Sequence, residues 1–269
     1  KYSIKSIMLF NSTQWTKETW SIQSMLKNIS YMKKMQQFWL TSISLYNMLH
    51  VQFIKKSLPD LEIYSSVTLH IKELEMARYI KKLWVDIITI PEEMNRDFKF
   101  IEDIKTKLWF KIQVMLNEWC IKNCPFRDMH FDISVNWWEF SEDWKNFNKD
   151  WLMPNFHCVS FFKENRRYIF RSCFIRPEDV SNYEDKVDYF KIVSRDYDSI
   201  KIENILKAYI NQKYSWNLFD IVDFPVSPDW KSVKFIDNDL LTKKNFFQKI
   251  QHCPHDCDTC FACDQYFND

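Results

Sequence analysis

The sequence contains no glycine, although average usage of about 7% predicts roughly 19 in a chain of 269 residues. A chain without glycine has no Gly-rich phosphate loop. It also has no HExxH zinc motif and no Ser-His-Asp ordering. Nucleotide-binding, metalloprotease and classical hydrolase functions therefore lack support.

The sequence also lacks an excess of charge and a long apolar run. It has 37 basic and 36 acidic residues, so no global field recruits nucleic acid or an anionic membrane. No apolar run approaches the roughly 20 residues of a membrane span, and the opening KYSIKSIMLF is too short for a signal peptide. We expect a cytoplasmic protein without a membrane partner. Because its first residue is Lys, we expect the chain to start inside a longer reading frame.

Many of the twelve tryptophans occupy positions typical of glycine. Trp39, Trp84 and Trp109 each lie between an amphipathic helical pattern and an apolar strand, where a left-handed residue favours Gly. Further tryptophans follow turn residues, at Trp137, Trp138, Trp216 and Trp230. We infer that they stand where the natural protein has glycine, as in a gene whose stop codon is read as glycine. The alternative is a face of surface aromatics; we give these residues no functional role.

The chain alternates between apolar strands and amphipathic helices, which is typical of a parallel sheet flanked by helices. The pattern predicts strands at 40–46, 61–69, 85–90, 112–116, 168–175 and 187–193. It predicts helices at 17–38, 47–57, 71–83 and 97–108, one from Pro177, and one at 199–213. The fold class is therefore α/β, a TIM-like (β/α) barrel without its usual first strand; an open doubly wound sheet is the alternative. We expect a barrel at 1–222 with a long insertion at 120–168, followed by a Cys-rich metal-binding tail at 223–269.

All eight cysteines lie after residue 119, and without a secretory signal their clustering favours metal ligation over disulfides. The tail carries Cys253-x3-Cys257-x2-Cys260-x2-Cys263, four thiols that can close around one soft metal centre. Structural zinc and a [4Fe–4S] cluster both remain open, and free surface thiols are the alternative. The spacing of the first three also resembles the radical S-adenosylmethionine triad, which we keep as an alternative although the triad here follows the last strand.

A second group of cysteines surrounds the strand that ends near residue 116. Glu118, Cys120 and Cys124 follow this strand, while Cys158 lies in the insertion and Cys173 in the next predicted strand. Ligands gather beyond the carboxyl ends of parallel strands, so folding could bring these residues together. The alternative is a loop with incidental buried cysteines.

Charged residues supply further candidates at strand ends. Glu118 could be a general acid or base, or a charge partner of Arg127. Arg176, Lys191 and Arg195 could clamp a carboxylate or phosphate, or form ordinary ion pairs with Glu178 and Asp179. Asn95, Arg96 and Asp97 also follow a predicted strand, with a weaker case.

Several motifs occur in the order known from one protein family. KNCPFRDMH after a strand ending in NE-x-C, then CFIRPEDV and VDYFKIVSRD, resembles the collagenase-like peptidase family (unassigned-type family number thirty-two) and its iron–sulfur relatives. SLPDLEIYSSVTLHI and PEEMNRDF are similar to its upstream half, and CPHDCDTCFAC to the Cys-rich tail of one branch. The resemblance covers most of residues 38–267.

The resemblance implies a TIM-barrel-like fold and an oxygen-sensitive [4Fe–4S] cluster, whose ligands here would be Cys120, Cys124, Cys158 and Cys173. It implies oxygen-independent hydroxylation of an RNA base or a quinone precursor, with prephenate as oxygen donor. The sequence departs from the pattern at Trp39 and Trp119, where the family has Gly, and its first two cysteines are closer together than in the RNA-modifying members.

We therefore expect a cytoplasmic iron–sulfur enzyme that uses Glu118, Arg176, Lys191 and Arg195 on a small anionic substrate or RNA. A partner subunit of the same family is also expected. The alternatives are a peptidase, as the family label says, a non-catalytic barrel with structural zinc, and a radical S-adenosylmethionine-type enzyme.

Overall fold

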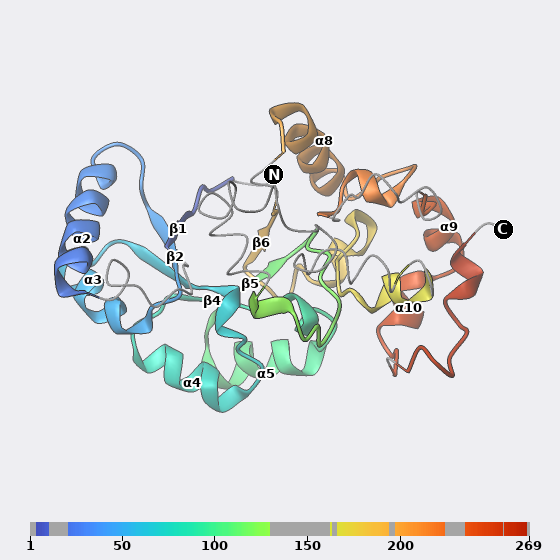
Figure 1. Cartoon of the computed structure of the whole chain (residues 1–269), viewed down its shortest axis with the longest axis horizontal. Coiled ribbons are helices and arrows are strands. Elements are labelled where there is room, and N and C mark those ends of the chain that lie inside the picture. Colours follow the sequence, from blue (N-terminus) through green and yellow to red (C-terminus); the bar gives the residue numbers. More distant parts are fainter. Residues whose placement is uncertain are drawn as a thin grey trace, which may run out of the picture.

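The structure, a computed structural model, describes residues 4–10, 21–129, 162, 166–193, 197–223, 235–254 and 256–267. Six strands form one parallel sheet in the order of the sequence (Figure 1). They are β1 (Met8–Phe10), β2 (Ser42–Leu45), β3 (Glu62–Ser65), β4 (Ile87–Thr89), β5 (Lys111–Met115) and β6 (Tyr189–Lys191). A doubly wound sheet reverses its strand order at a switch point. The uninterrupted order among the described strands is that of a barrel.

The sheet curls upon itself. Lys5, just before β1, lies 3.1 Å from Glu62 Oε2 in β3, and its ammonium is 5.3 Å from the ring centre of Tyr189 in β6. In a flat sheet, five spacings of about 4.8 Å would place β6 roughly 24 Å from β1. The rings of Tyr64 and Tyr189 also meet at 5.6 Å. The six strands therefore form a curled, half-barrel sheet.

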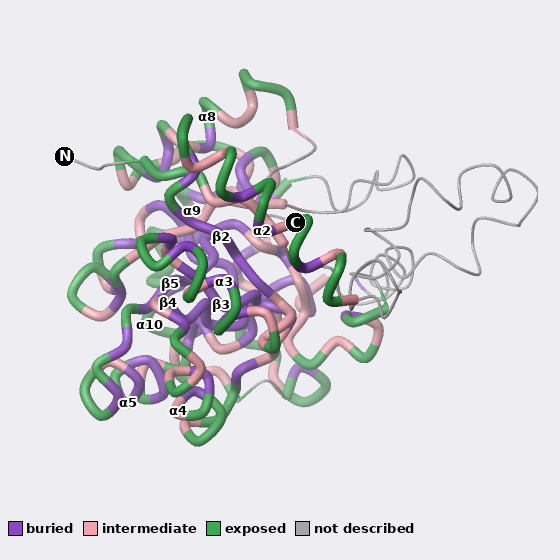
Figure 2. Tube along the Cα trace, turned by 90° about the vertical axis from the view of Figure 1, so that its left-hand side faces the viewer, coloured by how far each residue is buried: buried purple, intermediate pink, exposed green. Residues whose placement is uncertain are grey.

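Helices cover the outer side of this sheet. They are α2 (Ile22–Gln36), α3 (Val51–Ser57), α4 (Leu74–Lys82), α5 (Phe98–Leu108) and α8 (Ser199–Ile210). Short 3₁₀ turns follow β2, β3 and β4: η1 (Met48–His50), η2 (Val67–Leu69) and η3 (Glu92–Met94). Two more lie elsewhere: η6 (Pro177–Asn182) precedes β6, and η7 (Leu218–Asp220) follows α8. Figure 2 shows the buried strands inside a shell of helices whose outer sides are exposed.

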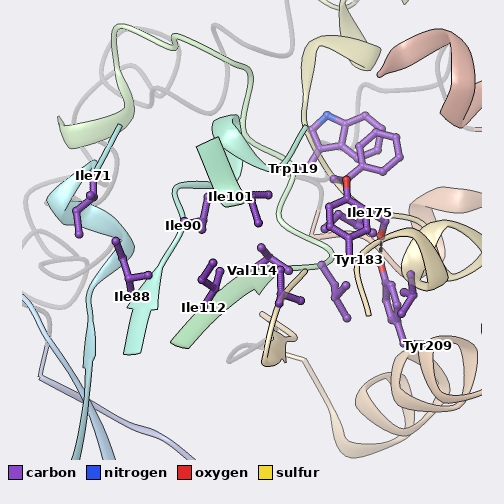
Figure 3. Close-up of a cluster of buried hydrophobic side chains, with 14 of the residues drawn as sticks. Ile71, Ile88, Ile90, Ile101, Ile112, Val114, Trp119, Ile175, Tyr183 and Tyr209 are labelled. Carbon is purple, nitrogen blue, oxygen red and sulfur yellow. Dashed lines mark hydrogen bonds between the residues drawn. The ribbon is translucent and has the colours of Figure 1, made fainter. Parts of the chain in front are cut away.

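The two faces of the sheet differ in polarity, because successive strand residues point to opposite sides. The face toward the helices carries Ile43, Ile63, Ile88, Ile112 and Val114, all within one apolar core. Figure 3 shows this core where Ile88, Ile112 and Val114 meet side chains from neighbouring elements. The opposite face carries a polar set in register across the strands, namely Ser44, Glu62, Tyr64, Thr89, Gln113 and Tyr189. Leu9, Ile87 and Met115 share this face, so the concave side of the half-barrel is mostly polar with apolar residues among the polar ones.

Local signals explain where the helices begin. The side chains of Ser21, Asp97 and Asp198 accept hydrogen bonds from the first-turn amides of α2, α5 and α8. Such side-chain caps satisfy amides that have no partner within the helix. The predicted helices at 71–83, 97–108 and 199–213 are confirmed, with slightly shorter bounds.

The positive φ angle that favours glycine is found at three of the tryptophans and not at Trp39, whereas the inference that glycine stands there in the natural protein stays a prediction. Trp84, Trp109 and Trp216 have φ angles of 71°, 53° and 118°, and each is at least half exposed. Trp39 ends α2 through a hydrogen bond from its amide to Met35 O and does not have a positive φ. The turn after α2 closes without a left-handed residue at this point. Trp137, Trp138 and Trp230 lie outside the described residues.

Two other expectations differ from the structure. The stretch 168–175 is not a strand: Arg166–Arg171 forms the 3₁₀ segment η5, in which Tyr168, Ile169 and Phe170 are all buried. Three consecutive buried side chains need packing partners on every side. A strand at the edge of the sheet would not provide them. Conversely, Met8–Phe10 supplies a strand before β2 that the pattern did not predict.

The C-terminal elements are α9 (Asn238–Lys243), α10 (Phe246–Ile250) and η8 (Asp264–Tyr266). Their buried residues Phe246, Ile250 and Tyr266 belong to the same apolar core as the barrel. Figure 1 shows the red C-terminal segments beside the yellow segment that contains η5. The division into barrel and metal-binding tail stays a prediction. No helix in the described ranges is both long and apolar enough to cross a membrane.

Candidate functional site

A buried polar cluster lies where β4 and β5 end. Pro91 follows β4 and leads into η3, which contributes Glu92 and Glu93; Asn117 and Glu118 follow β5. The Asn117 amide group binds Val193 twice, since Nδ2 donates to Val193 O at 2.8 Å and Val193 N donates to Oδ1 at 2.9 Å. This ties the ends of β5 and β6 together and positions Glu118.

Arg127 is the centre of the cluster. Its Nη2 lies 2.9 Å from Glu92 Oε1 and its Nη1 lies 3.0 Å from Glu93 Oε1. Its Nε donates to Cys120 Sγ at 3.3 Å. Lys72 adds a second cation, with Nζ 2.5 Å from Glu93 Oε1. The side chains of Glu92, Glu93 and Arg127 are 1%, 2% and 4% exposed, so these charges depend on one another for solvation.

Several buried atoms of the cluster retain unused hydrogen-bonding capacity. Glu92 Oε2, Asn95 Oδ1 and Arg96 Nη2 make no hydrogen bond, and Glu92 Oε1 meets Arg127 at ion-pair distance without hydrogen-bond geometry. Buried polar groups are normally satisfied, and a group of exceptions indicates a place where a ligand or ion binds. The cluster therefore has the character of a binding site.

Glu118 lies beside this cluster, in surroundings that disfavour the ionised form of its carboxyl group. Burial raises the pKa of its carboxyl well above the usual range, and the nearby Glu92, Asp223 and Cys120 raise it further. Arg127 opposes this shift more weakly. Arg127 makes its ion pairs with Glu92 and Glu93 and acts on Glu118 through its charge without such a contact. The environment favours the protonated form, which can donate a proton.

The thiols of the first group approach the same cluster. Cys120 contacts the Cys124 thiol, which together with burial raises the pKa of Cys120 well above its usual range. Cys173 Sγ donates to Glu93 O at 3.4 Å, while Asn123 N donates to Glu93 Oε2 at 3.0 Å. One glutamate thus links Cys173 with the turn that carries Cys124. Cys158 lies outside the described residues.

Two of the three predicted cations, Arg176 and Lys191, lie within the described residues. Arg176 donates from Nε and Nη2 to the two oxygens of Asp179, at 2.8 and 2.7 Å, and from Nη1 to Thr242 Oγ1 at 3.1 Å. The interpretation of Arg176 as an ordinary ion-pair partner matches this geometry. Lys191 ends β6, as predicted, and Arg195 lies outside the described residues.

Sequence reasoning missed the roles of Glu92 and Glu93. The sequence does contain a signal for them. Two acidic residues directly follow Pro91 and the apolar strand before it, and this places them at the carboxyl end of a parallel strand. Among the described residues, no three Cys, His, Asp or Glu side chains converge closely enough to hold a metal ion as they stand. The four tail cysteines all lie within the described residues.

Comparison with known proteins supports the family resemblance. No protein-family model matches the sequence. A curated protein of Methanocaldococcus jannaschii, described as an uncharacterized protease, is 27% identical over 241 residues, covering 88% of this chain and 69% of that protein. Among solved structures, that of a U32 peptidase has a TM-score of 0.49 at 12% identity, covering 72% of this chain and 71% of that chain. Through its ordered motifs and its likeness to the archaeal protein, the chain resembles the collagenase-like peptidase (U32) family.

Proposed function

We propose that the chain is an enzyme whose active site is the cluster of Glu92, Glu93, Glu118 and Arg127. The observation that carries this proposal is the buried Arg127, held between two carboxylates and a thiol at the strand ends, with polar atoms left unsatisfied. A buried ion-pair cluster of this kind lowers the stability of the fold. At strand ends it provides polar side chains that are already oriented for binding a ligand.

We further propose that Cys120, Cys124, Cys158 and Cys173 hold an iron–sulfur cluster beside this site. The donor chemistry fits, since three of these thiols lie around Glu93 and Arg127, and N–H groups directed at sulfur tune such clusters. Binding would require the thiols to turn toward a common centre and lose their protons. The bound cluster would supply one-electron chemistry.

The reaction class we propose is oxygen-independent hydroxylation of an RNA base or a small aromatic or quinone substrate. In balanced form, substrate C–H and an organic hydroxyl donor such as prephenate exchange H for OH, so the substrate is oxidised by two electrons and the donor is reduced. Glu118 would hold the transferred proton near Glu92, and Arg127 would keep the carboxylates oriented. The family resemblance of the motifs supports this reaction.

Amide hydrolysis is the second candidate. Glu118 and Glu92 repel one another, which helps to raise the pKa of Glu118. Two neighbouring carboxyl groups, one of which has a raised pKa, can divide acid and base roles between them, as hydrolysis of a peptide bond by water requires. The likeness to an archaeal protein described as a protease also supports this candidate.

Anaerobic purification with iron, sulfide and zinc quantification tests the proposal. We expect about four iron and four sulfide for the barrel cluster, lost in Cys120→Ser and Cys173→Ser and retained in the tail variant Cys260→Ser. Unchanged iron in Cys120→Ser, or zinc without sulfide, would overturn the iron–sulfur assignment. Peptide cleavage that survives Cys120→Ser but is lost in Glu118→Gln would favour the hydrolase.

A further inference from the structure

The C-terminal segment is fixed to η5 by aromatic packing. Phe170 of η5 meets the rings of Phe246, Tyr266 and Phe267, with centroids 5.2, 5.4 and 5.4 Å apart. Phe246 and Tyr266 are buried. The chain between α10 and η8 is therefore held at both ends against one short segment of the barrel.

The chain between these anchors is poor in apolar residues and rich in thiols. It contains Cys253, Cys257, Cys260 and Cys263, and its described part forms turns closed by Cys253 N to Ile250 O and Cys260 N to Asp256 O. Cys257 is buried in the apolar core, and the other three thiol residues are partly buried. Apolar burial alone gives such a segment little reason to keep one conformation.

The four thiols lie within electrostatic reach of one another. Burial, together with the nearby Cys253, Cys257 and Cys260, raises the pKa of Cys263 to about 12. Arg171 acts in the opposite direction on Cys257, and Arg96 on Cys263. A set of four thiolates bound to a metal would carry negative charge, and these guanidinium groups are placed to offset it.

The outside of the thiol loop is held by Arg167. Its Nη1 donates to the carbonyl oxygens of Cys257 and Cys260 at 3.3 and 3.5 Å. Its guanidinium lies 4.2 Å from the ring centre of Phe261, and its Nε is 3.3 Å from Asp264 Oδ1. Arg167 thus fixes the backbone of two cysteines, which is the role of the residues that surround a metal ligand set.

We propose that Cys253, Cys257, Cys260 and Cys263 bind one thiophilic metal centre that clamps the C-terminal segment onto η5. The sulfur atoms would turn inward on binding, because they do not converge on an ion as they stand. Both Zn²⁺ and an iron–sulfur cluster accept four thiolates. This site is separate from the barrel thiols and does not depend on the proposed reaction.

The clamp has a consequence for the candidate active site. η5 runs directly into Ser172, which pairs with Ile121, and Lys122 N donates to Arg171 O at 3.3 Å. The next residue is Cys173, whose thiol contacts Glu93. A metal in the tail would therefore hold the backbone that positions Cys173 and the Cys120–Cys124 turn.

Metal analysis of the full chain, purified anaerobically, tests the proposal. Against the unsubstituted chain, Cys260→Ser should lose about one zinc, or about four iron and four sulfide, while the barrel variant Cys124→Ser retains that share. If Cys260→Ser loses zinc and the sulfide content does not change, the tail binds a zinc ion. If it loses iron and sulfide together, the tail binds an iron–sulfur cluster. Equal metal content in Cys260→Ser and the unsubstituted chain would overturn the proposal.

Thiol alkylation of the unsubstituted chain gives a readout that needs no variant. Mass spectrometry should show the four tail cysteines protected before chelator treatment and modified after it. Amide hydrogen exchange in η5 should become faster after chelation, while exchange in α4 stays unchanged. If all four thiols are modified at the same rate before and after chelation, there is no tail centre, whatever metal the barrel thiols hold.

Discussion

At the scale of single residues, the three left-handed tryptophans are the clearest departure from ordinary backbone chemistry. Trp84 and Trp109 follow α4 and α5 with φ angles of 71° and 53° and have exposed rings. A Cβ atom clashes with the backbone in this region, and an exposed indole recovers little packing energy. These residues pay a conformational cost that glycine avoids.

Replacing Trp84 or Trp109 with Gly should therefore stabilise the protein. We expect a gain of about 1 kcal/mol for each in the free energy of unfolding, measured by urea denaturation. Trp39→Gly is the matched control, because Trp39 also follows a helix but lacks a positive φ, and it should give no gain. A gain at Trp39 equal to that at Trp109 would contradict the explanation.

The raised pKa of Glu118 predicts a specific pH dependence. The unfolded carboxyl releases its proton near the ordinary glutamate value of about 4.3, whereas the folded one holds it to higher pH. Between the two pKa values the folded state binds more protons, so stability falls as pH rises through this window.

Glu118→Gln removes this titration and should unfold at higher urea concentration than the parent at pH 8, with the difference shrinking toward pH 4. Glu203→Gln, on the exposed side of α8, is the control and should show no such advantage. If the Glu118→Gln advantage were the same at both pH values, the carboxyl would not be the titrating group.

At the scale of elements, Arg127 joins η3 to the turn after β5. Arg127→Met keeps much of the side-chain volume but leaves Glu92 and Glu93 as buried carboxylates, of which Glu93 keeps its ion pair with Lys72. Removing one partner of a buried ion pair costs about 3–5 kcal/mol. We expect a loss of that size in urea denaturation.

The triple variant Arg127→Met, Glu92→Gln, Glu93→Gln should recover most of this loss, because it removes the uncompensated charges. The control Lys107→Met breaks an exposed pair with Asp103 on α5 and should cost less than about 1 kcal/mol. A loss in Arg127→Met no larger than in Lys107→Met would show that Arg127 does not hold the carboxylates.

At the scale of the whole molecule, the barrel and the C-terminal segment share one core. Phe246 is 1% exposed and meets Phe170 and Tyr266, and the guanidinium of Arg176 lies 5.2 Å from its ring centre. Phe246→Ala should cost about 3–5 kcal/mol and shift a single unfolding transition monitored by fluorescence and circular dichroism. Phe53→Ala, at an exposed position on α3, should shift it little. Two separate transitions in the parent would show that the segments unfold independently.

The alternating barrel core could be predicted from the sequence, because the continuous apolar run at 85–90 and the helical period at 97–108 are local signals. The conformation of Tyr168–Phe170 could not, since it depends on rings at 246 and 266 that are distant in sequence. In the candidate site, Glu118, Cys120 and Cys124 were predictable because they follow a strand that the apolar pattern identifies. Its ion pairs were not, because the Glu92–Arg127 contact joins two loops that only tertiary structure brings together.

The opposite polarity of the two sheet faces also protects the protein against errors in folding. In β5, Lys111 and Gln113 alternate with Ile112 and Val114, and the partners of three of these residues match in polarity: Ile88 pairs with Ile112, Thr89 and Tyr189 pair with Gln113, and Phe190 pairs with Val114. A slip of one residue during strand pairing would place a lysine and a glutamine among the core isoleucines and expose valine to the polar side. Each incorrect pairing is thus penalised at several positions at once, and the same alternation that lines the candidate site with polar groups selects the correct register.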